Sequence, residues 1–227
     1  PKQQCQMRHL LSTKVLSDEE IHQLEGVGWR IDHYNAISIE FLETAVAPDD
    51  HLLIFSSKNG VAGFFNSFSK HSLSACRCLC VGNGAAGMLT EKGMTVLEVF
   101  PTAKKLADSL NIKYSSDSFV YYCGDKRLDL IPDTLNNLGL VWKEATVYRT
   151  LFNPRKWDRE YEGIVFFSPS AVRSFIALNS MGSATGYCIG KTTGAALEKY
   201  TNRVLSPKTP DRKSLMDLLL WQENELT

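Results

Sequence analysis

Residues 51–65 read HLLIFSSKNGVAGFF, which is an apolar run, a Ser-rich turn and then the start of a helical pattern. Residues 162–176 read EGIVFFSPSAVRSFI and take the same form 111 residues further along. The aligned residues include Ser57 with Ser168, Val61 with Val172 and Phe64 with Phe175. A unit of strand, turn and helix that occurs twice indicates an internal repeat.

Two further segments repeat in the same order. Residues 80–89 (CVGNGAAGML) match residues 188–197 (CIGKTTGAAL), and residues 101–110 (PTAKKLADSL) match residues 210–219 (PDRKSLMDLL). Their separations of 108 and 109 residues are close to that of the first pair. Three blocks in one order and at nearly one spacing predict two similar modules.

A further, weaker match joins residues 9–14 to residues 119–124. In each case apolar residues at helical spacing follow, then a Gly that suits a helix C-terminus, then a second strand-like run at 29–39 or 140–151. Strands that alternate with helices predict parallel sheets. The predicted fold class is therefore α/β, with two similar domains that each contain a parallel sheet flanked by helices.

Composition limits the kind of protein this is. The chain has 227 residues, 44% of them hydrophobic and 22% charged, with 25 Lys+Arg against 25 Asp+Glu. This length allows one large domain or two small ones, and zero net charge argues against nucleic-acid binding. No apolar run approaches the roughly 20 residues that span a bilayer, and residues 1–8 contain no apolar signal core. We expect a cytoplasmic protein that contacts neither membrane nor nucleic acid.

Six cysteines stand at positions 5, 76, 78, 80, 123 and 188. The spacing of two puts Cys76, Cys78 and Cys80 on one face of a strand, which suits packing better than a tetrahedral metal site. No Cys-x-x-Cys pair or His cluster completes a zinc ligand set. We expect free thiols and no metal.

The predicted helix openings carry the chemistry. Each of four helical patterns begins directly after an apolar run, at residues 57–59, 83–84, 168–170 and 191–193. Ser, Thr and Asn at such positions cap free backbone N–H groups, and for any single opening capping alone is a sufficient explanation. Four equivalent openings also predict anion binding, because helix N-termini at the carboxyl ends of parallel strands attract anions.

An ordered set of short motifs resembles the uroporphyrinogen-III synthase family. The resemblance extends from about His9 to Leu219. The motifs are Ile54–Ser57 (IFSS) with Val61, Val81–Asn83 (VGN), Cys123–Arg127 (CGDKR) with Ile131 and Pro132, Thr146–Thr150 (TVYRT), Phe166–Val172 (FFSPSAV) and Ile189–Thr193 (IGKTT).

The resemblance implies two α/β domains joined by a two-stranded linker, with an interdomain cleft. The implied first domain comprises residues 1–35 and 150–227, and the second comprises residues 36–149. It also implies a cofactor-independent lyase of porphyrin and heme biosynthesis. In this family the linear tetrapyrrole hydroxymethylbilane loses water and closes to uroporphyrinogen III, with ring D inverted through a spiro intermediate.

The resemblance places Tyr148 at the position of the family's cleft-facing tyrosine. A phenol stays protonated at neutral pH, so Tyr148 is the expected donor to the leaving hydroxyl group. The alternative is a tyrosine that only packs between domains. The residues implied to hold substrate carboxylates are Ser57, Asn59, Asn83, Gly124, Arg127, Ser168, Ser170, Lys191, Thr192 and Thr193.

Two positions weaken this assignment. Arg127 stands beside Lys126, and a solvated surface role suits it equally well. Family members often carry Thr where this chain has Ala85, so one expected hydroxyl is missing.

Two other functions are compatible with parts of the pattern. A non-catalytic two-domain protein that binds a small anionic ligand is the main alternative. Nucleotide binding is disfavoured, because the acidic partner of the nominal Gly82-x-Gly84-x-x-Gly87 fingerprint would be Asp108, in a helical pattern rather than at a strand end. The enzyme is expected to be a monomer.

Overall fold

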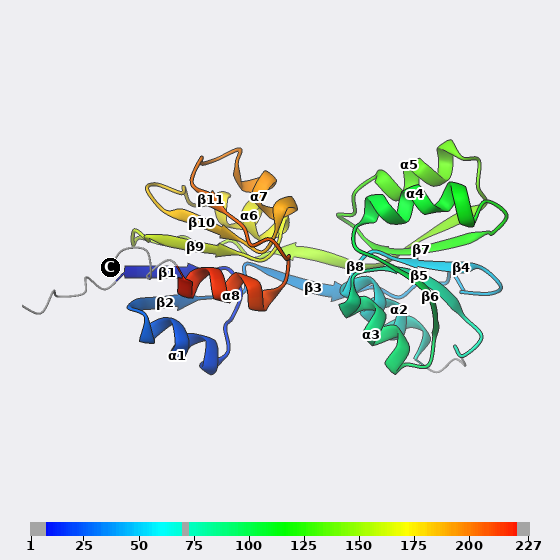
Figure 1. The fold of residues 1–227 in the computed structure, drawn as a ribbon, viewed down its shortest axis with the longest axis horizontal. Helices are drawn as coiled ribbons and strands as arrows, with labels where there is room; N and C mark the ends of the chain where they lie inside the picture. Colours follow the sequence, from blue (N-terminus) through cyan, green and yellow to red (C-terminus); the bar gives the residue numbers. More distant parts are fainter. Residues whose placement is uncertain (1–7, 70–72, 222–227) are drawn as a thin grey trace, which may run out of the picture. The chain divides into compact units, whose positions relative to one another are not determined.

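The computed structural model describes residues 8–69 and 73–221 (Figure 1). Cys5 lies outside the described residues. The chain forms two compact units, with changeovers between Ser38 and Ile39 and between Thr150 and Leu151. Unit 2 is the continuous stretch between these points, and unit 1 is built from the residues on either side of it.

Unit 1 contains a five-stranded sheet in the order β11-β10-β9-β1-β2. Every neighbouring pair in this sheet is parallel. The strands are β1 (Arg8–Ser12), β2 (Trp29–His33), β9 (Gly163–Phe166), β10 (Thr185–Cys188) and β11 (Val204–Leu205).

The second sheet has six strands in the order β3-β8-β7-β4-β5-β6. Its pairings from β8 to β6 are parallel. The strands are β3 (Ile37–Phe41), β4 (Leu52–Phe55), β5 (Arg77–Val81), β6 (Thr95–Phe100), β7 (Phe119–Gly124) and β8 (Trp142–Phe152). Both changeovers between the units fall inside strands, one in β3 and one in β8, and these two strands are hydrogen-bonded neighbours.

The two sheet orders confirm the sequence repeat. Strands β6, β5, β4, β7 and β8 of unit 2 follow one another as β11, β10, β9, β1 and β2 do in unit 1. The repeated blocks occupy the same places, since β4 matches β9 and β5 matches β10. The fold is α/β with two similar modules, as the alternation of strands and helices predicts.

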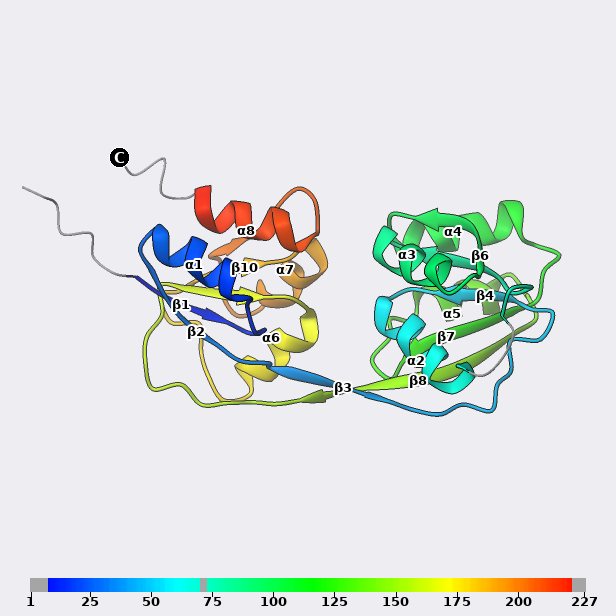
Figure 2. The same ribbon diagram turned by 90° about the horizontal axis from the view of Figure 1, so that it is seen from below.

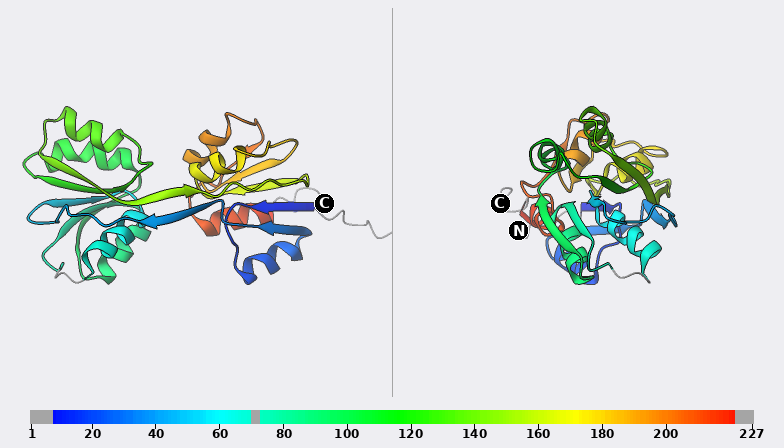
Figure 3. Two further views of the ribbon diagram at one scale, coloured as in Figure 1. Left: turned by 180° about the vertical axis from the view of Figure 1, so that it is seen from behind. Right: turned by 90° about the vertical axis from the view of Figure 1, so that its right-hand side faces the viewer.

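Helices cover both faces of each sheet (Figure 1). In unit 2, α2 and α3 pack on one face, and α4 and α5 on the other. Figure 2 looks onto the α2 side, and Figure 3 shows the same layers from behind. The helices are α2 (Lys58–Phe68), α3 (Asn83–Glu91), α4 (Ala103–Lys113) and α5 (Leu130–Asn137).

Unit 1 repeats this layering. Helices α6 and α7 bury their apolar residues on one face of its sheet, while α1 and α8 cover the other. These helices are α1 (Asp18–Gly26), α6 (Pro169–Ile176), α7 (Lys191–Leu197) and α8 (Arg212–Trp221). Among the described residues, no helix combines the length and the apolar character needed to cross a bilayer.

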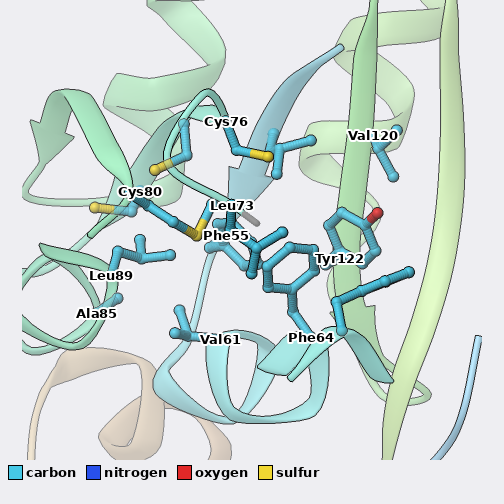
Figure 4. Packing of buried hydrophobic residues seen from close by; sticks show 14 of the residues in the cluster. Phe55, Val61, Phe64, Leu73, Cys76, Cys80, Ala85, Leu89, Val120 and Tyr122 are labelled. Carbon is cyan, nitrogen blue, oxygen red and sulfur yellow. The ribbon is translucent and has the colours of Figure 1, made fainter. Parts of the chain in front are cut away.

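The clustered cysteines belong to the core of unit 2. Cys76, Cys78 and Cys80 lie in the hydrophobic cluster under α2 and α3, among Phe55, Phe64 and other apolar side chains (Figure 4). Burial raises the pKa of the Cys78 thiol to about 12. The thiols are therefore unreactive packing groups at neutral pH. All five described cysteines are free, as the sequence predicts.

Candidate active site

The candidate site lies at the carboxyl-end edge of the unit 2 sheet, where β4 and β7 end beside Tyr148 of β8. Gly124 is the last residue of β7, and Tyr148 of β8 is its partner in the register. Ser57 follows β4 at the start of α2. The Tyr148 hydroxyl lies 3.2 Å from Ser57 Oγ. Of the residues predicted from sequence, Ser57 and Gly124 are both brought against Tyr148.

Ser57 is the N-cap of α2, as predicted. Its Oγ accepts a hydrogen bond of 3.0 Å from the Gly60 backbone N–H. The same arrangement recurs in unit 1, where Ser168 Oγ accepts from the Ala171 N–H at 3.1 Å. Pro169 occupies the first turn of that helix, where its missing N–H costs nothing.

The Tyr148 side chain is partly buried against the α2 face of the sheet. Burial raises its pKa above the usual value of 10.0, and the hydrogen bond with Ser57 opposes this shift. The phenol is therefore fully protonated at neutral pH and available as a donor.

Lys58 is a charged residue of this site that sequence reasoning missed. It is the first residue of α2, and its side chain lies across the start of α3. A methyl group added to Gly84 would come within 2.5 Å of Lys58 Cε and 3.1 Å of its Nζ. Neither helix carries an acidic residue in its first turn. Two helix N-termini and an ammonium group thus place positive charge together, which favours an anion.

The prediction of side-chain caps is wrong for α3 and α7. Their N-caps are Gly82 and Gly190, and neither helix has a side-chain cap hydrogen bond. Asn83 and Lys191 are already the first helical residues, and their side chains are exposed. The first N–H groups of these helices are therefore not occupied by a capping side chain.

Thr193 faces the interior. Its residue is 3% exposed, and its backbone N–H bonds the Gly190 carbonyl, so the structure gives it a packing position rather than a surface one. Ala85 is the equivalent residue of unit 2 and is also buried. The missing hydroxyl at position 85 therefore removes no exposed donor.

Arg127 is engaged by protein carboxylates. Its Nε and one terminal nitrogen lie 2.8 and 2.7 Å from Glu144 Oε2, and the other terminal nitrogen lies 2.5 Å from Asp129. These pairs raise the pKa of Arg127 above its usual range. Since two carboxylates already balance its charge, a structural role is favoured over a substrate contact.

The remaining predicted residues keep the positions expected of them. Asn59 is the second residue of α2 and half-buried. Ser170 is near the start of α6, where its Oγ accepts from Arg173 at 3.3 Å, and Thr192 is exposed near the start of α7. In the described part of the chain, no group of three or more His, Cys, Asp and Glu side chains is arranged to hold a metal ion.

Comparison with protein families gives the decisive match. The family model described as HEM4, uroporphyrinogen-III synthase HemD, matches residues 18–217. The chain belongs to this family. Uroporphyrinogen-III synthases are cyclising lyases that need no cofactor, and the resemblance in the motifs is thereby confirmed.

Solved uroporphyrinogen-III synthases have the same fold. The chain is 16% identical to the enzyme of Helicobacter pylori 26695, with a TM-score of 0.73 over 94% of this chain and 99% of that one. It is 15% identical to a mutant of the Thermus thermophilus enzyme, with a TM-score of 0.69 over 96% and 98% of the two chains. The wild-type Thermus thermophilus enzyme in another crystal form gives 16% identity and a TM-score of 0.56 over 97% and 100%. No curated protein sequence matches the chain.

Family membership gives the activity. The chain is an enzyme of porphyrin and heme biosynthesis that cyclises hydroxymethylbilane to uroporphyrinogen III. Nothing observed favours the alternative of a non-catalytic binding protein.

Proposed function

We propose that Tyr148 is the proton donor in the cyclisation of hydroxymethylbilane, and that the carboxyl-end edge of the unit 2 sheet holds part of this substrate. The observation that supports the proposal is the hydrogen bond between Tyr148 and the helix-capping Ser57. It fixes a protonated phenol beside helix N-termini that favour anions.

Ser57 links Tyr148 to the start of α2. Because Ser57 Oγ accepts from the Gly60 N–H, its own proton is free to be donated to the Tyr148 oxygen. The proton of Tyr148 is then available to the substrate. Hydrogen bonds in such a chain polarise one another, and the positive helix N-terminus stabilises negative charge on the phenol oxygen.

The chemistry follows from this arrangement. The bond between the terminal carbon and its hydroxyl group breaks, Tyr148 gives its proton to the departing oxygen, and water leaves. The substrate becomes an azafulvenium cation, balanced by the Tyr148 phenolate, and the substituted carbon of ring D attacks it to form the spiro intermediate. The bond from ring D to the methylene of ring C then breaks, which gives a second azafulvenium cation on ring C. This cation forms a bond to the unsubstituted α-carbon of the reversed ring D, and the proton lost from that carbon as the pyrrole regains aromaticity returns to Tyr148. The protein contributes mainly proximity and orientation, which can reach effective molarities of about 10⁵–10⁸ M.

The substrate's carboxylates are assigned to the helix openings. In unit 2 the proposed contacts are Asn59, Asn83 and the ammonium group of Lys58, because the one hydroxyl proton of Ser57 is directed to Tyr148. In unit 1 they are Ser168, Ser170, Lys191 and Thr192. Charged and hydroxyl donors of this kind, together with free backbone N–H groups, bind carboxylates without a basic protein surface.

A direct test measures the product isomer. Purified chain mixed with hydroxymethylbilane should yield uroporphyrinogen III in large excess over the symmetric isomer, because spontaneous closure uses the unsubstituted position of ring D. The product is oxidised and the isomers are separated by chromatography. An isomer ratio equal to that of a protein-free control would refute the proposed function.

The role of Lys58 predicts an effect on binding. Lys58→Gln should raise KM about tenfold and leave kcat nearly unchanged, because a charge-assisted contact to a carboxylate is worth about 1.5–3 kcal/mol. The rise of KM with salt should also be smaller in the variant. Steady-state kinetics at two ionic strengths measure both effects.

Lys92→Gln is the matched control. Lys92 is exposed at the opposite end of α3, so its replacement makes the same change in net charge away from the helix openings. An equal change of KM in both variants would show that Lys58 acts only through the overall charge of the protein.

We also propose that the enzyme acts as a monomer in the cytoplasm, without nucleic-acid partners. Free thiols at all five described cysteine positions suit a reducing compartment. The balance of 25 basic and 25 acidic residues supports the absence of a nucleic-acid surface.

A further inference from the structure

Gly124 lies directly beneath the phenol of Tyr148. It is the buried last residue of β7, and the register between β7 and β8 shifts between Cys123 and Gly124 so that Tyr148 becomes its partner. A β-carbon built on Gly124 would lie 2.3 Å from Tyr148 Cζ, 2.4 Å from Cε2 and 2.7 Å from the hydroxyl oxygen. Real β-carbons do not approach other atoms so closely, so the phenol occupies the space that any other residue would fill.

The backbone around Gly124 is fixed independently of this contact. The Asp125 N–H bonds the Tyr148 carbonyl at 3.1 Å, and the Thr150 N–H bonds the Asp125 carboxylate at 2.9 Å. The Arg127 N–H bonds the Gly124 carbonyl at 3.2 Å. Because these bonds hold the end of β7 against β8, Gly124 cannot move away from a larger side chain at little cost. The Tyr148 ring is the part that would have to turn.

We infer that Gly124 is a positioning residue for Tyr148 rather than a substrate contact. This inference rests on the proposed role of Tyr148. The ring has two points of support: the bare backbone of Gly124 beneath its hydroxyl end, and Ser57 Oγ at its oxygen. Together they select the rotamer in which the phenol meets the start of α2. A β-carbon at position 124 removes the first support and thereby breaks the second.

The test is a double-mutant cycle with Gly124→Ala and Tyr148→Phe. Gly124→Ala alone should lower kcat about as much as Tyr148→Phe, on the order of a hundredfold. In the Tyr148→Phe background, Gly124→Ala should cause little further loss of kcat, because both changes remove the same interaction. Losses that multiply would overturn the inference, since Gly124 would then act independently of Tyr148.

A second readout does not depend on activity. With carbon-13-labelled tyrosine, the NMR signal that disappears in Tyr148→Phe identifies Tyr148 and can be titrated. Its pKa, which burial raises in the wild type, should fall toward the ordinary value of about 10 in Gly124→Ala as the ring turns into solvent. An unchanged pKa would overturn the inference. If Tyr148→Phe leaves kcat unchanged while this pKa shift occurs, the proton-donor role fails and the positioning of the ring stands.

Two controls separate an effect on folding from an effect on the Tyr148 ring. If Gly124→Ala destabilises the protein through the ring, the added Tyr148→Ala change should restore the urea midpoint toward that of Tyr148→Ala alone. A midpoint that stays low in the double variant would place the clash elsewhere and contradict the inference. Gly87→Ala is the matched control, because Gly87 is exposed in α3 with no atom within 4 Å of an added β-carbon. It should keep kcat and slightly raise stability.

Discussion

Tyr148→Phe should lower kcat about a hundredfold while the fold remains intact. The change removes only the hydroxyl group that is proposed to protonate the departing oxygen, and general acid assistance is typically worth about 10²–10⁴-fold. We expect the low end of this range, because an activated pyrrolic leaving site needs less help. The lost hydrogen bond to Ser57, at 3.2 Å, should cost about 1 kcal/mol of stability or less. Steady-state kinetics and a urea titration measure the two effects.

The proposed role of Tyr148 also predicts how kcat depends on pH. Tyr148 must be protonated to act, and its pKa is raised above 10.0 by burial. The wild-type kcat should therefore show no fall due to Tyr148 until the pH exceeds about 10, and should decline above that value. Tyr148→Phe should lack this alkaline decline, because the group that titrates is absent.

Tyr114→Phe serves as the control. Its hydroxyl bonds Glu98 at 3.0 Å, beyond the end of α4, and it has no part in the site. It should retain the wild-type kcat. A Tyr148→Phe enzyme with a kcat within threefold of the wild type would support the alternative in which Tyr148 only packs.

The repeat made the fold predictable from the sequence. Each repeated block contains a complete strand–turn–helix unit, and units of the same pattern are expected to take equivalent places in their sheets. The weakest match was displaced by one residue. The strand registers pair Leu10 with Gly163 and Phe119 with Leu52, so Leu10, not His9, is equivalent to Phe119. Short runs of apolar residues on a sheet buried on both faces lack the alternation that would fix their alignment.

The candidate site was predictable only in part. Ser57 and Ser168 cap their helices because a Ser after a buried strand is a local signal. The contact of Lys58 with Gly84 depends on two helices brought together by sheet order and on one side-chain rotamer, and no local pattern encodes either. The pairing of Arg127 with Glu144 likewise joins residues 17 positions apart through the register of β7 and β8.

Equivalent residues of the repeat have different packing in the two units, which predicts different losses of stability when they are replaced. Phe64 and Phe175 are equivalent residues with exposures of 0% and 2%. Phe64 contacts four aromatic rings, at centroid distances of 4.7 to 5.3 Å. For Phe175 one such contact is present, with Phe166 at 5.6 Å. Both counts refer to the described residues. Aromatic pairs add about 0.5–1.5 kcal/mol each beyond their buried area.

Phe64→Ala should therefore destabilise unit 2 by about 4–5 kcal/mol, and Phe175→Ala should destabilise unit 1 by about 3 kcal/mol. Hydrogen exchange followed by mass spectrometry separates the two effects, because each peptide reports the opening of its own unit. Exchange should accelerate in β4, β7 and α2 of the first variant and in β9 and α6 of the second. Each unit has its own hydrophobic clusters. A loss of packing in one cluster should therefore accelerate exchange first in the unit that contains it. Equal acceleration throughout the chain in both variants would show that the two units do not open independently. A larger effect of Phe175→Ala would show that the aromatic contacts of Phe64 add no stability.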